Sequence, residues 1–403
     1  MTWILLAASV LLGLLALPLA LVVSVFAVQV VAAAWPPRVV APRAKVRSSR
    51  ARVAVLVPAH DEAGGIEQTL RAVLPQLHAG DRLLVVADNC SDDTAAVARR
   101  AGAEVVERFH ATDRGKGFAL AFGVDALRAS PPGLVVILDA DCELAPNALD
   151  ALADRVAATG RPAQALYLML TASDARLPRR VAQFAWRVRN WVRPAGWHRL
   201  GLPCQLMGTG MAFTWQMLRE APLANASIVE DMKLGIALGI AGRPPVFCAD
   251  ALVTSRFPDA AAATKTQRTR WEHGHLEMIL REVPGMLSAA WQQRDRRLLG
   301  MALDLCVPPL ALLAAALLAG TGLAALVSWR AEDGTLLSVY VFLLAVFMAT
   351  ALLAWRARGR DLVRLVELLS IPLYVAAKLP LYARFVFRRE KRWVRTDRDN
   401  SPP

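Results

Sequence analysis

Three long apolar runs flank a central region in which short apolar and polar stretches alternate. The runs cover residues 3–34, 298–328 and 335–355, and a hydrophilic link at 330–334 separates the last two. A helix needs about 20 apolar residues to cross the hydrocarbon core of a membrane. The pattern therefore predicts an N-terminal transmembrane helix within residues 1–35 and a transmembrane hairpin at residues 298–355.

The N-terminal run has a second interpretation, a cleaved signal peptide. No basic segment precedes it, it is longer than the apolar core of a signal peptide, and no clear small-residue cleavage site follows it. We therefore expect this helix to be retained.

A further apolar segment at residues 361–387 is less regular. Only ten uncharged residues lie between Glu367 and Lys378, which is short for a span. This favours an interfacial or re-entrant helix, followed by a basic cytoplasmic tail at residues 388–403.

The central region, residues 50–290, has the pattern of an α/β domain. Residues 53–57, 83–87 and 134–138 are continuously apolar, as expected for strands that are buried on both faces of a parallel sheet. Three helix-like stretches lie among these runs. The first ends near residue 77, the second ends near residue 100, and the third covers residues 116–128. The order strand, helix, strand, helix predicts a mostly parallel sheet with right-handed crossovers.

Acidic residues follow these strands at the points where the strands end. Asp61 and Glu62 follow the first run, Asp88 follows the second, and Asp139 and Asp141 follow residues 134–138. Parallel sheets bind ligands just outside the carboxyl ends of their strands. Aspartate oxygens can hold Mg or Mn and leave positions for phosphates. An alternative is that the 139/141 pair caps the next helix, but acids converging on one edge favour a metal site.

The chain is 55% hydrophobic and has a formal net charge of +13. The basic residues near the predicted spans are Arg38, Arg43, Lys45, Arg47, Arg50 and Arg52 after the first, Arg294, Arg296 and Arg297 before the second, and Arg356, Arg358 and Arg360 after the third. The positive-inside rule then places the central domain in the cytoplasm, in a multi-pass protein of the inner (cytoplasmic) membrane. We expect the positive charge to bind anionic membrane lipids. We expect no binding of nucleic acid, because the sequence has no recognisable DNA- or RNA-binding motif.

The five cysteines are scattered and form no pair with zinc-type spacing. Free thiols in a reducing compartment explain them most simply.

Five separated motifs carry a family resemblance. In order they are residues 57–62 (VPAHDE), residues 88–94 (DNCSDDT), Asp139 with Asp141, Glu230 with Asp231, and residues 267–271 (QRTRW). On these motifs the region from about Val53 to Trp271 resembles family 2 glycosyltransferases of the GT-A fold. It resembles in particular the membrane-integrated group that includes cellulose, hyaluronan and poly-N-acetylglucosamine synthases.

The resemblance implies a donor site for a UDP-sugar. Pro58, Glu62 and Asp88 would contact the donor, with Asp88 at the uracil or ribose, where a carboxylate can accept hydrogen bonds. Asp141 would ligate the metal that bridges the diphosphate, and Asp139 would support the metal or the nucleotide. A basic residue behind a glycine turn, Lys116, is our candidate for a diphosphate contact, although it could also be an ordinary residue at a helix start.

The resemblance also implies an acceptor site. Asp231 would be the general base of an inverting transfer, beside Glu230, although Val229 replaces the Thr or Ser that often precedes this pair. Three residues of the last motif, Gln267, Arg270 and Trp271, would hold the diphosphate and stack on the acceptor sugar. The same three could instead belong to an amphipathic helix at the membrane surface.

Two further segments keep open interpretations. Gly208 and Thr209 resemble a small-residue loop near the acceptor, or they mark a turn. Residues 184–199, rich in Trp and Arg, favour a helix at the lipid interface, with contact to an acceptor lipid as the alternative.

The predicted function is hexosyl transfer to a polysaccharide or a lipid-linked acceptor, in exopolysaccharide or glycolipid synthesis. Three spans are few for enclosing a polymer channel, whereas the QRTRW motif favours a growing polysaccharide. A non-catalytic membrane scaffold or transport subunit with a glycosyltransferase-like domain is the alternative, which the intact acids disfavour.

Overall fold

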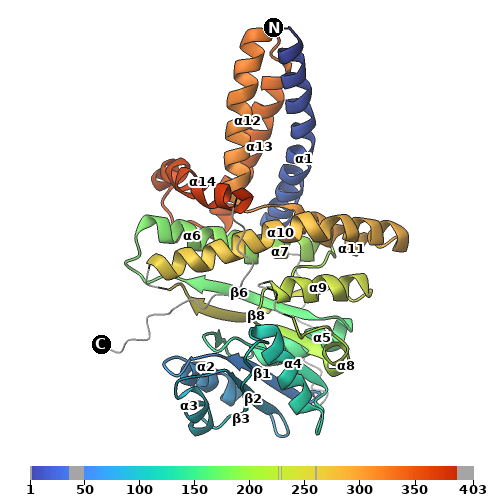
Figure 1. Ribbon diagram of the computed structural model, residues 1–403, viewed down its shortest axis with the longest axis vertical. Coiled ribbons are helices and arrows are strands. Elements are labelled where there is room, and N and C mark those ends of the chain that lie inside the picture. Colours follow the sequence, from blue (N-terminus) through green and yellow to red (C-terminus); the bar gives the residue numbers. More distant parts are fainter. Residues whose placement is uncertain (1, 36–49, 226, 228, 259–260, 388–403) are drawn as a thin grey trace.

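The computed structural model describes residues 2–35, 50–225, 227, 229–258 and 261–387. Figure 1 shows three tiers, with a helical bundle at one end, an α/β domain at the other and a layer of helices between them. The predicted basic segment after the first span, apart from Arg50 and Arg52, and the predicted basic tail at 388–403 lie outside the described residues.

One mixed sheet forms the centre of the α/β domain. Its order is β3-β2-β1-β4-β7-β6-β8-β5. The strands are β1 (Val53–Ala59), β2 (Arg82–Asp88), β3 (Glu104–Arg108), β4 (Leu134–Ile137), β5 (Glu143–Leu144), β6 (Ala163–Leu170), β7 (Met211–Thr214) and β8 (Val246–Arg256). Strands β1 to β4 run parallel, whereas β7 is antiparallel to both of its neighbours and β5 is antiparallel to β8. The prediction of a mostly parallel α/β sheet is confirmed.

Helices cover both faces of this sheet, which is why the central strands are apolar throughout. Their bounds are α2 (Ile66–Val73), η1 (Leu74–Gln76), α3 (Thr94–Arg100), α4 (Lys116–Leu127), α5 (Ala148–Thr159), α8 (Trp215–Arg219) and α9 (Glu230–Ile240). Val55 of β1 belongs to the core beneath α2, α3 and α5. The next residue, Leu56, belongs to the core beneath α4, α8 and α9. Successive side chains of a strand point to opposite faces, so both positions must be apolar.

The bundle consists of α1 (Thr2–Ala34), α12 (Leu310–Ala331) and α13 (Thr335–Arg358). The layer beneath it contains α6 (Leu177–Arg187), the π-helical turn η2 (Val188–Val192), α7 (Arg193–Arg199), α10 (Ala261–Gln293), α11 (Arg296–Cys306), η3 (Leu365–Ser370) and α14 (Ile371–Phe387). Among the described residues, four stretches are long and apolar enough to cross a membrane, namely Trp3–Ala34, Leu310–Ala331, Thr335–Arg358 and Leu365–Phe385. These helices suggest a membrane protein.

The predicted span at residues 298–328 is wrong in its first part. Residues up to Cys306 form the separate helix α11, and the spanning helix α12 begins only at Leu310. Pro308 and Pro309 lie at the break. Proline lacks a backbone N–H and its ring clashes with the preceding turn, so two in succession end a helix. Helix α11 lies in the intermediate layer of Figure 1 and packs alongside α10, with its Met301 in the same core cluster as Met286 of α10.

Helix α14 lies across the base of the bundle in Figure 1, beside the intermediate layer and not along α12 and α13. Its length and composition would also allow a span. The interfacial placement of residues 361–387 is compatible with this orientation and stays a prediction.

A buried polar network fastens the bundle to the layer beneath it. The Gln29 side chain, on α1, donates from Nε2 to Asp304 Oδ1 at 2.6 Å. Arg193, on α7, donates to the same oxygen at 2.8 Å and from Nε to Gln29 Oε1 at 2.8 Å. The Arg193 side chain is 7% exposed and that of Asp304 13%, so each charge depends on the other for compensation. Three segments that are distant in sequence therefore meet at one carboxylate.

Replacing Asp304 should destabilise the whole assembly. Asp304→Ala leaves the buried Arg193 guanidinium without its carboxylate, and loss of one partner of a buried ion pair costs about 3 kcal/mol. We expect a clearly lower midpoint of thermal unfolding for the purified full chain in detergent. Asp125→Ala, which removes an exposed carboxylate from α4, is the control and should leave the midpoint unchanged. Equal midpoints for both variants would contradict the assigned role.

Candidate active site

The Asp139 and Asp141 carboxylates lie in the loop that follows β4. A carboxylate oxygen from each and the Cys142 sulfur lie within 4.8 Å of one another. The loop is fixed by two hydrogen bonds, from the Asp139 N–H to Thr209 Oγ1 at 3.0 Å and from Thr69 Oγ1 to the Ala140 carbonyl at 2.8 Å. The acids therefore have defined positions at the carboxyl end of the strand.

This group of side chains fits a hard divalent cation. Burial and the charges of Asp141 and Asp139 raise the pKa of the Cys142 thiol well above its ordinary value. The thiol thus stays protonated, and the ligands offered are carboxylate oxygens. Oxygen ligands suit Mg²⁺ and Mn²⁺, whereas zinc sites prefer thiolate and imidazole.

Lys116 is the first residue of α4 and points into the same region. Its ammonium group pairs with Asp139 and donates to the Gly208 carbonyl at 2.7 Å. Burial alone would lower the pKa of Lys116, but the charges of Asp139, Glu230 and Asp231 outweigh burial and raise it. The lysine therefore remains charged among three carboxyl groups.

Glu230 and Asp231 open helix α9 on the other side of Lys116. Burial raises the pKa of Glu230 to about 7, with Lys116 acting against this shift and Asp231 adding to it. Burial also raises the pKa of Asp231, although Lys116, the Met232 N–H and Arg189 all favour its charged form. A carboxyl group with a raised pKa binds a proton more tightly once it has ionised, which suits a general base.

Two glycines allow these elements to approach one another. A Cβ atom on Gly117 would lie 2.5 Å from the Leu223 carbonyl oxygen and 2.6 Å from that of Asn225. The loop before α9 therefore packs directly on the first turn of α4. Gly208 has φ +90°, and a Cβ there would lie 3.5 Å from Asp231 Oδ2 and 3.7 Å from Lys116 Nζ. The Gly208 and Thr209 loop thus lies between the two groups of acids, near the predicted base.

Asp88 ends β2 and is buried in an ion pair that the sequence analysis missed. Arg108 Nη1 lies 2.6 Å from Asp88 Oδ1, and Asn89 Nδ2 donates to the same oxygen at 3.0 Å. Asp88 is also aligned with Arg108 in the register of β2 and β3. The pairing of Asp88 with Arg108 therefore follows from the parallel register of β2 and β3, which the sequence alone does not specify.

The other two predicted donor residues belong to β1 and the turn after it. Pro58 lies within β1, paired with Val86 of β2. The Glu62 N–H donates to Thr94 Oγ1 at 2.8 Å, which ties the β1 turn to the start of α3. Both residues therefore lie close to the strand ends. These contacts do not identify a ligand for either of them.

The last predicted motif lies on α10. Trp271 packs against Trp186 of α6, with ring centroids 4.8 Å apart, and Tyr167 meets Trp186 edge-on at 5.5 Å. Arg270 is half-buried on the same helix. The side chain of Gln267 lies outside the described part of the chain. The structure therefore places Trp271 in an aromatic cluster where the α/β domain meets the intermediate helices.

Arg189, from the segment of residues 184–199, is a second residue that the sequence analysis did not single out. Burial lowers the pKa of its guanidinium and the charge of Asp231 raises it, so the two groups interact electrostatically. Nothing in the spacing of this Trp- and Arg-rich segment indicates which arginine faces the acids, because the π-helical turn changes the helical phase there.

The family is decided by a match of residues 51–274 to the family model described as "Glycosyltransferase like family 2". The chain belongs to glycosyltransferase family 2. The matched region contains all five motifs and the whole sheet. The predicted enzyme class, glycosyltransferase, is confirmed.

Curated relatives match over shorter regions. An uncharacterized glycosyltransferase of Mycobacterium tuberculosis (strain H37Rv) is 40% identical over 89 residues, which are 22% of this chain and 36% of that protein. The glycosyltransferase AglD of Haloferax volcanii is 32% identical over 112 residues, 26% of this chain and 18% of that protein. The matches thus span about a third or less of the length of these relatives.

Among solved structures, the mannosyltransferase PcManGT from Pyrobaculum calidifontis, in complex with GDP-Man and Mn²⁺, is similar over nearly its whole length. The TM-score is 0.51 at 18% identity, covering 88% of this chain and 99% of that one. The similarity supports a GT-A-like domain together with its flanking helices.

The raised pKa values of the α9 acids predict the pH dependence of this glycosyltransferase. A base must lose its proton before it can act, and burial raises the pKa of the proposed base, Asp231. We therefore expect kcat/KM for transfer to rise with pH through an acid limb that lies above the ordinary range of an aspartate. Glu230→Gln removes a neighbouring negative charge, so the limb should move to lower pH as Asp231 ionises more easily. A wild-type profile without an acid limb, or a limb that is unmoved in Glu230→Gln, would contradict this assignment.

Proposed function

We propose that this glycosyltransferase moves a hexosyl group from a nucleoside diphosphate sugar to an acceptor hydroxyl, with inversion at the anomeric carbon. The observation that carries the proposal is the position of the Lys116 ammonium between Asp139 and the pair Glu230 and Asp231. A donor diphosphate held near Asp139 and an acceptor held near Asp231 would then meet at one point.

On the donor side, Asp139 and Asp141 would hold a divalent cation, Mg²⁺ or Mn²⁺. When bound, such an ion neutralises charge that develops on the departing nucleoside diphosphate. Lys116 adds a positive charge from the protein itself, and Asp88 would orient the nucleoside.

The donor is proposed to be a UDP-sugar, because the motifs resemble those of family 2 glycosyltransferases that use such donors. The similar mannosyltransferase PcManGT was solved with GDP-Man and Mn²⁺, so a GDP-sugar is the natural comparison in binding experiments. The cation in that structure supports a metal-dependent reaction here.

On the acceptor side, Asp231 removes the hydroxyl proton as the acceptor oxygen attacks the anomeric carbon. The attack comes from the face opposite the departing diphosphate, which inverts the configuration. Burial keeps water away from this step, and Glu230 and Lys116 set the affinity of Asp231 for the proton. Trp271, which packs against Trp186, would offer an apolar ring face for an acceptor group.

We also propose that the catalytic domain faces the cytoplasm. Arg356 and Arg358 lie in the last turn of α13, at the domain end of the bundle, and Arg296 and Arg297 open α11 in the intermediate layer. The positive-inside rule expects basic residues on the cytoplasmic side. Arg358 lies over the Trp191 ring at 4.2 Å, as expected for residues at a membrane interface. Anionic lipid head groups would be partners of this layer. Membership in the polysaccharide-synthase group stays a prediction.

Two substitutions separate the donor and acceptor roles. Asp231→Asn should lower the rate of hexosyl transfer by at least about a hundredfold, the usual contribution of a general base, while UDP binding with Mn²⁺ persists. Asp141→Asn should weaken UDP binding in the presence of Mn²⁺. Isothermal titration of UDP and a radiolabelled transfer assay measure the two effects.

The matched control is Glu220→Gln, an exposed acid at the end of α8, which should bind and transfer like the wild type. Normal turnover in Asp231→Asn refutes the assigned base. Metal-dependent UDP binding that is unchanged in Asp141→Asn refutes the assigned ligand.

A further inference from the structure

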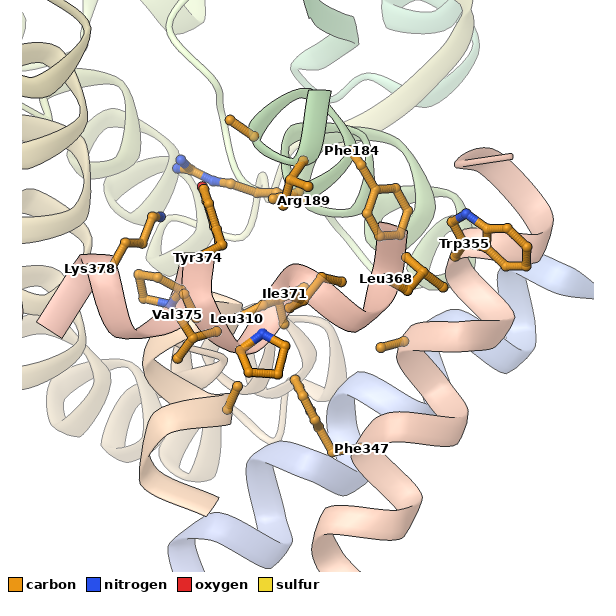
Figure 2. A pocket seen from close by; sticks show the side chains of 18 of the residues that line it. Phe184, Arg189, Leu310, Phe347, Trp355, Leu368, Ile371, Tyr374, Val375 and Lys378 are labelled. Atoms are coloured by element: carbon orange, nitrogen blue, oxygen red, sulfur yellow. The ribbon is translucent and has the colours of Figure 1, made fainter. Parts of the chain in front are cut away.

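A large apolar pocket lies where the bundle meets the intermediate helices. Its volume is about 930 Å³, within the range of small-molecule and cofactor sites. Figure 2 shows residues of several elements around it, among them Phe184 of α6, Leu310 of α12, Phe347 of α13 and Val375 of α14. The helices α12 and α13, and the stretch that contains most of α14, are apolar enough to cross a membrane, so a hydrocarbon chain could enter from the bilayer without crossing water.

One end of the pocket is polar. Arg189, Tyr374 and Lys378 lie together there in Figure 2. Lys378 forms an ion pair with Glu272, and its ammonium group lies 5.2 Å from the centre of the Tyr374 ring. Its charge is therefore already compensated within the protein.

Arg189 differs from the other cations of the pocket. Arg193 donates to Gln29 and Asp304, as described above. Within the described parts of the chain, the Arg189 guanidinium has neither a hydrogen bond nor an ion pair, and its contact is the Trp186 ring at 5.6 Å. Asp231 and Glu272 act on this guanidinium through their charges without forming an ion pair with it. Its N–H donors can therefore bind an anion, because arginine binds phosphate and carboxylate groups through paired N–H donors.

The polar end also adjoins the active site. Trp186 and Trp271 line the pocket, and the same two rings belong to the aromatic cluster beside Tyr167. Met232, the residue after Asp231, packs in one cluster with Met278 of α10, and Trp271 and His275 of that same helix line the pocket. The pocket and the proposed base thus share α10 as a neighbour, and the charge of Asp231 acts on Arg189.

We propose that the pocket holds the hydrocarbon chain of a membrane-lipid acceptor, with an anionic head group at Arg189 and a free hydroxyl directed to Asp231. This inference rests on the proposed function and names its acceptor class. A growing polysaccharide is a poor occupant, because an apolar wall would leave its hydroxyl groups without hydrogen-bond partners.

The reaction balances with the groups already named. The lipid hydroxyl oxygen forms a bond to the anomeric carbon of the donor while the bond from that carbon to the diphosphate oxygen breaks. The bonding electrons leave with the nucleoside diphosphate. The hydroxyl proton passes to Asp231.

Lipid binding to the purified, delipidated full chain tests the inference. Phosphatidylglycerol, which is anionic and carries free hydroxyls, is compared with zwitterionic phosphatidylcholine by native mass spectrometry, without any nucleotide sugar. The wild type should bind phosphatidylglycerol at least about tenfold more tightly, and Arg189→Gln should remove this preference. Arg189→Lys, which keeps the charge, should restore part of it. Equal affinity of the wild type for both lipids would overturn the head-group assignment.

The position of the chain is tested by filling the pocket from two different helices. Ala314→Trp on α12 and Ala351→Trp on α13 each place an indole among the lining residues and should weaken phosphatidylglycerol binding at least about tenfold. Leu326→Trp, at an exposed position of α12 outside the pocket, is the matched control. Undiminished binding in both pocket variants would overturn the proposal.

Thermal unfolding shows whether each variant has folded, independently of any ligand. If the wild type binds neither UDP nor GDP and hydrolyses neither a UDP-sugar nor a GDP-sugar, the proposed function fails while the lipid result can still be interpreted. If it hydrolyses the donor normally but neither pocket variant weakens lipid binding, the acceptor inference alone fails.

Discussion

The Lys116 ammonium group is the interaction on which the rest of the active site depends. It compensates three carboxyl groups from two parts of the chain, Asp139 after β4 and the pair at the start of α9. Without a cation at this point, holding these half-buried acids together would be unfavourable, because like charges repel and burial disfavours their charged forms. The small size of Gly117 and the conformation of Gly208 let the three segments come close enough for one ammonium group to serve them all.

In the proposed function this arrangement divides the chemistry between two parts of the molecule. The strand ends of the parallel sheet would provide the donor side, in a loop that is held by hydrogen bonds of its backbone. The acceptor side would lie at the intermediate helices, where Trp271 and Trp186 contact each other and line an apolar pocket beside the membrane-type helices. Gln29 of α1 binds both members of the Arg193 to Asp304 pair, so the same network connects the intermediate helices to the bundle.

The sequence predicts the sheet and the position of the acids proposed to bind a metal, because both depend on local patterns. Strands that are apolar on both faces must be covered on both faces, and acids directly after such strands must lie at one edge. Asp88 with Arg108 could not be paired in this way, since the partner depends on strand register. Arg189 could not be distinguished from its neighbours, because a π-helical turn sets its direction. The break before α12, in contrast, could have been predicted from Pro308 and Pro309. The apolar composition on both sides of the two prolines led to the prediction of one continuous span.

The role of Lys116 as the shared counter-charge is tested most directly by comparing Lys116→Met with Lys116→Arg in two assays, UDP binding with Mn²⁺ and hexosyl transfer. The methionine keeps much of the side-chain volume but removes the charge, whereas the arginine keeps the charge. If one cation serves both sides, Lys116→Met weakens UDP binding and slows transfer together, and Lys116→Arg recovers part of both. A Lys116→Met enzyme that binds UDP and transfers the hexosyl group like the wild type would contradict the account.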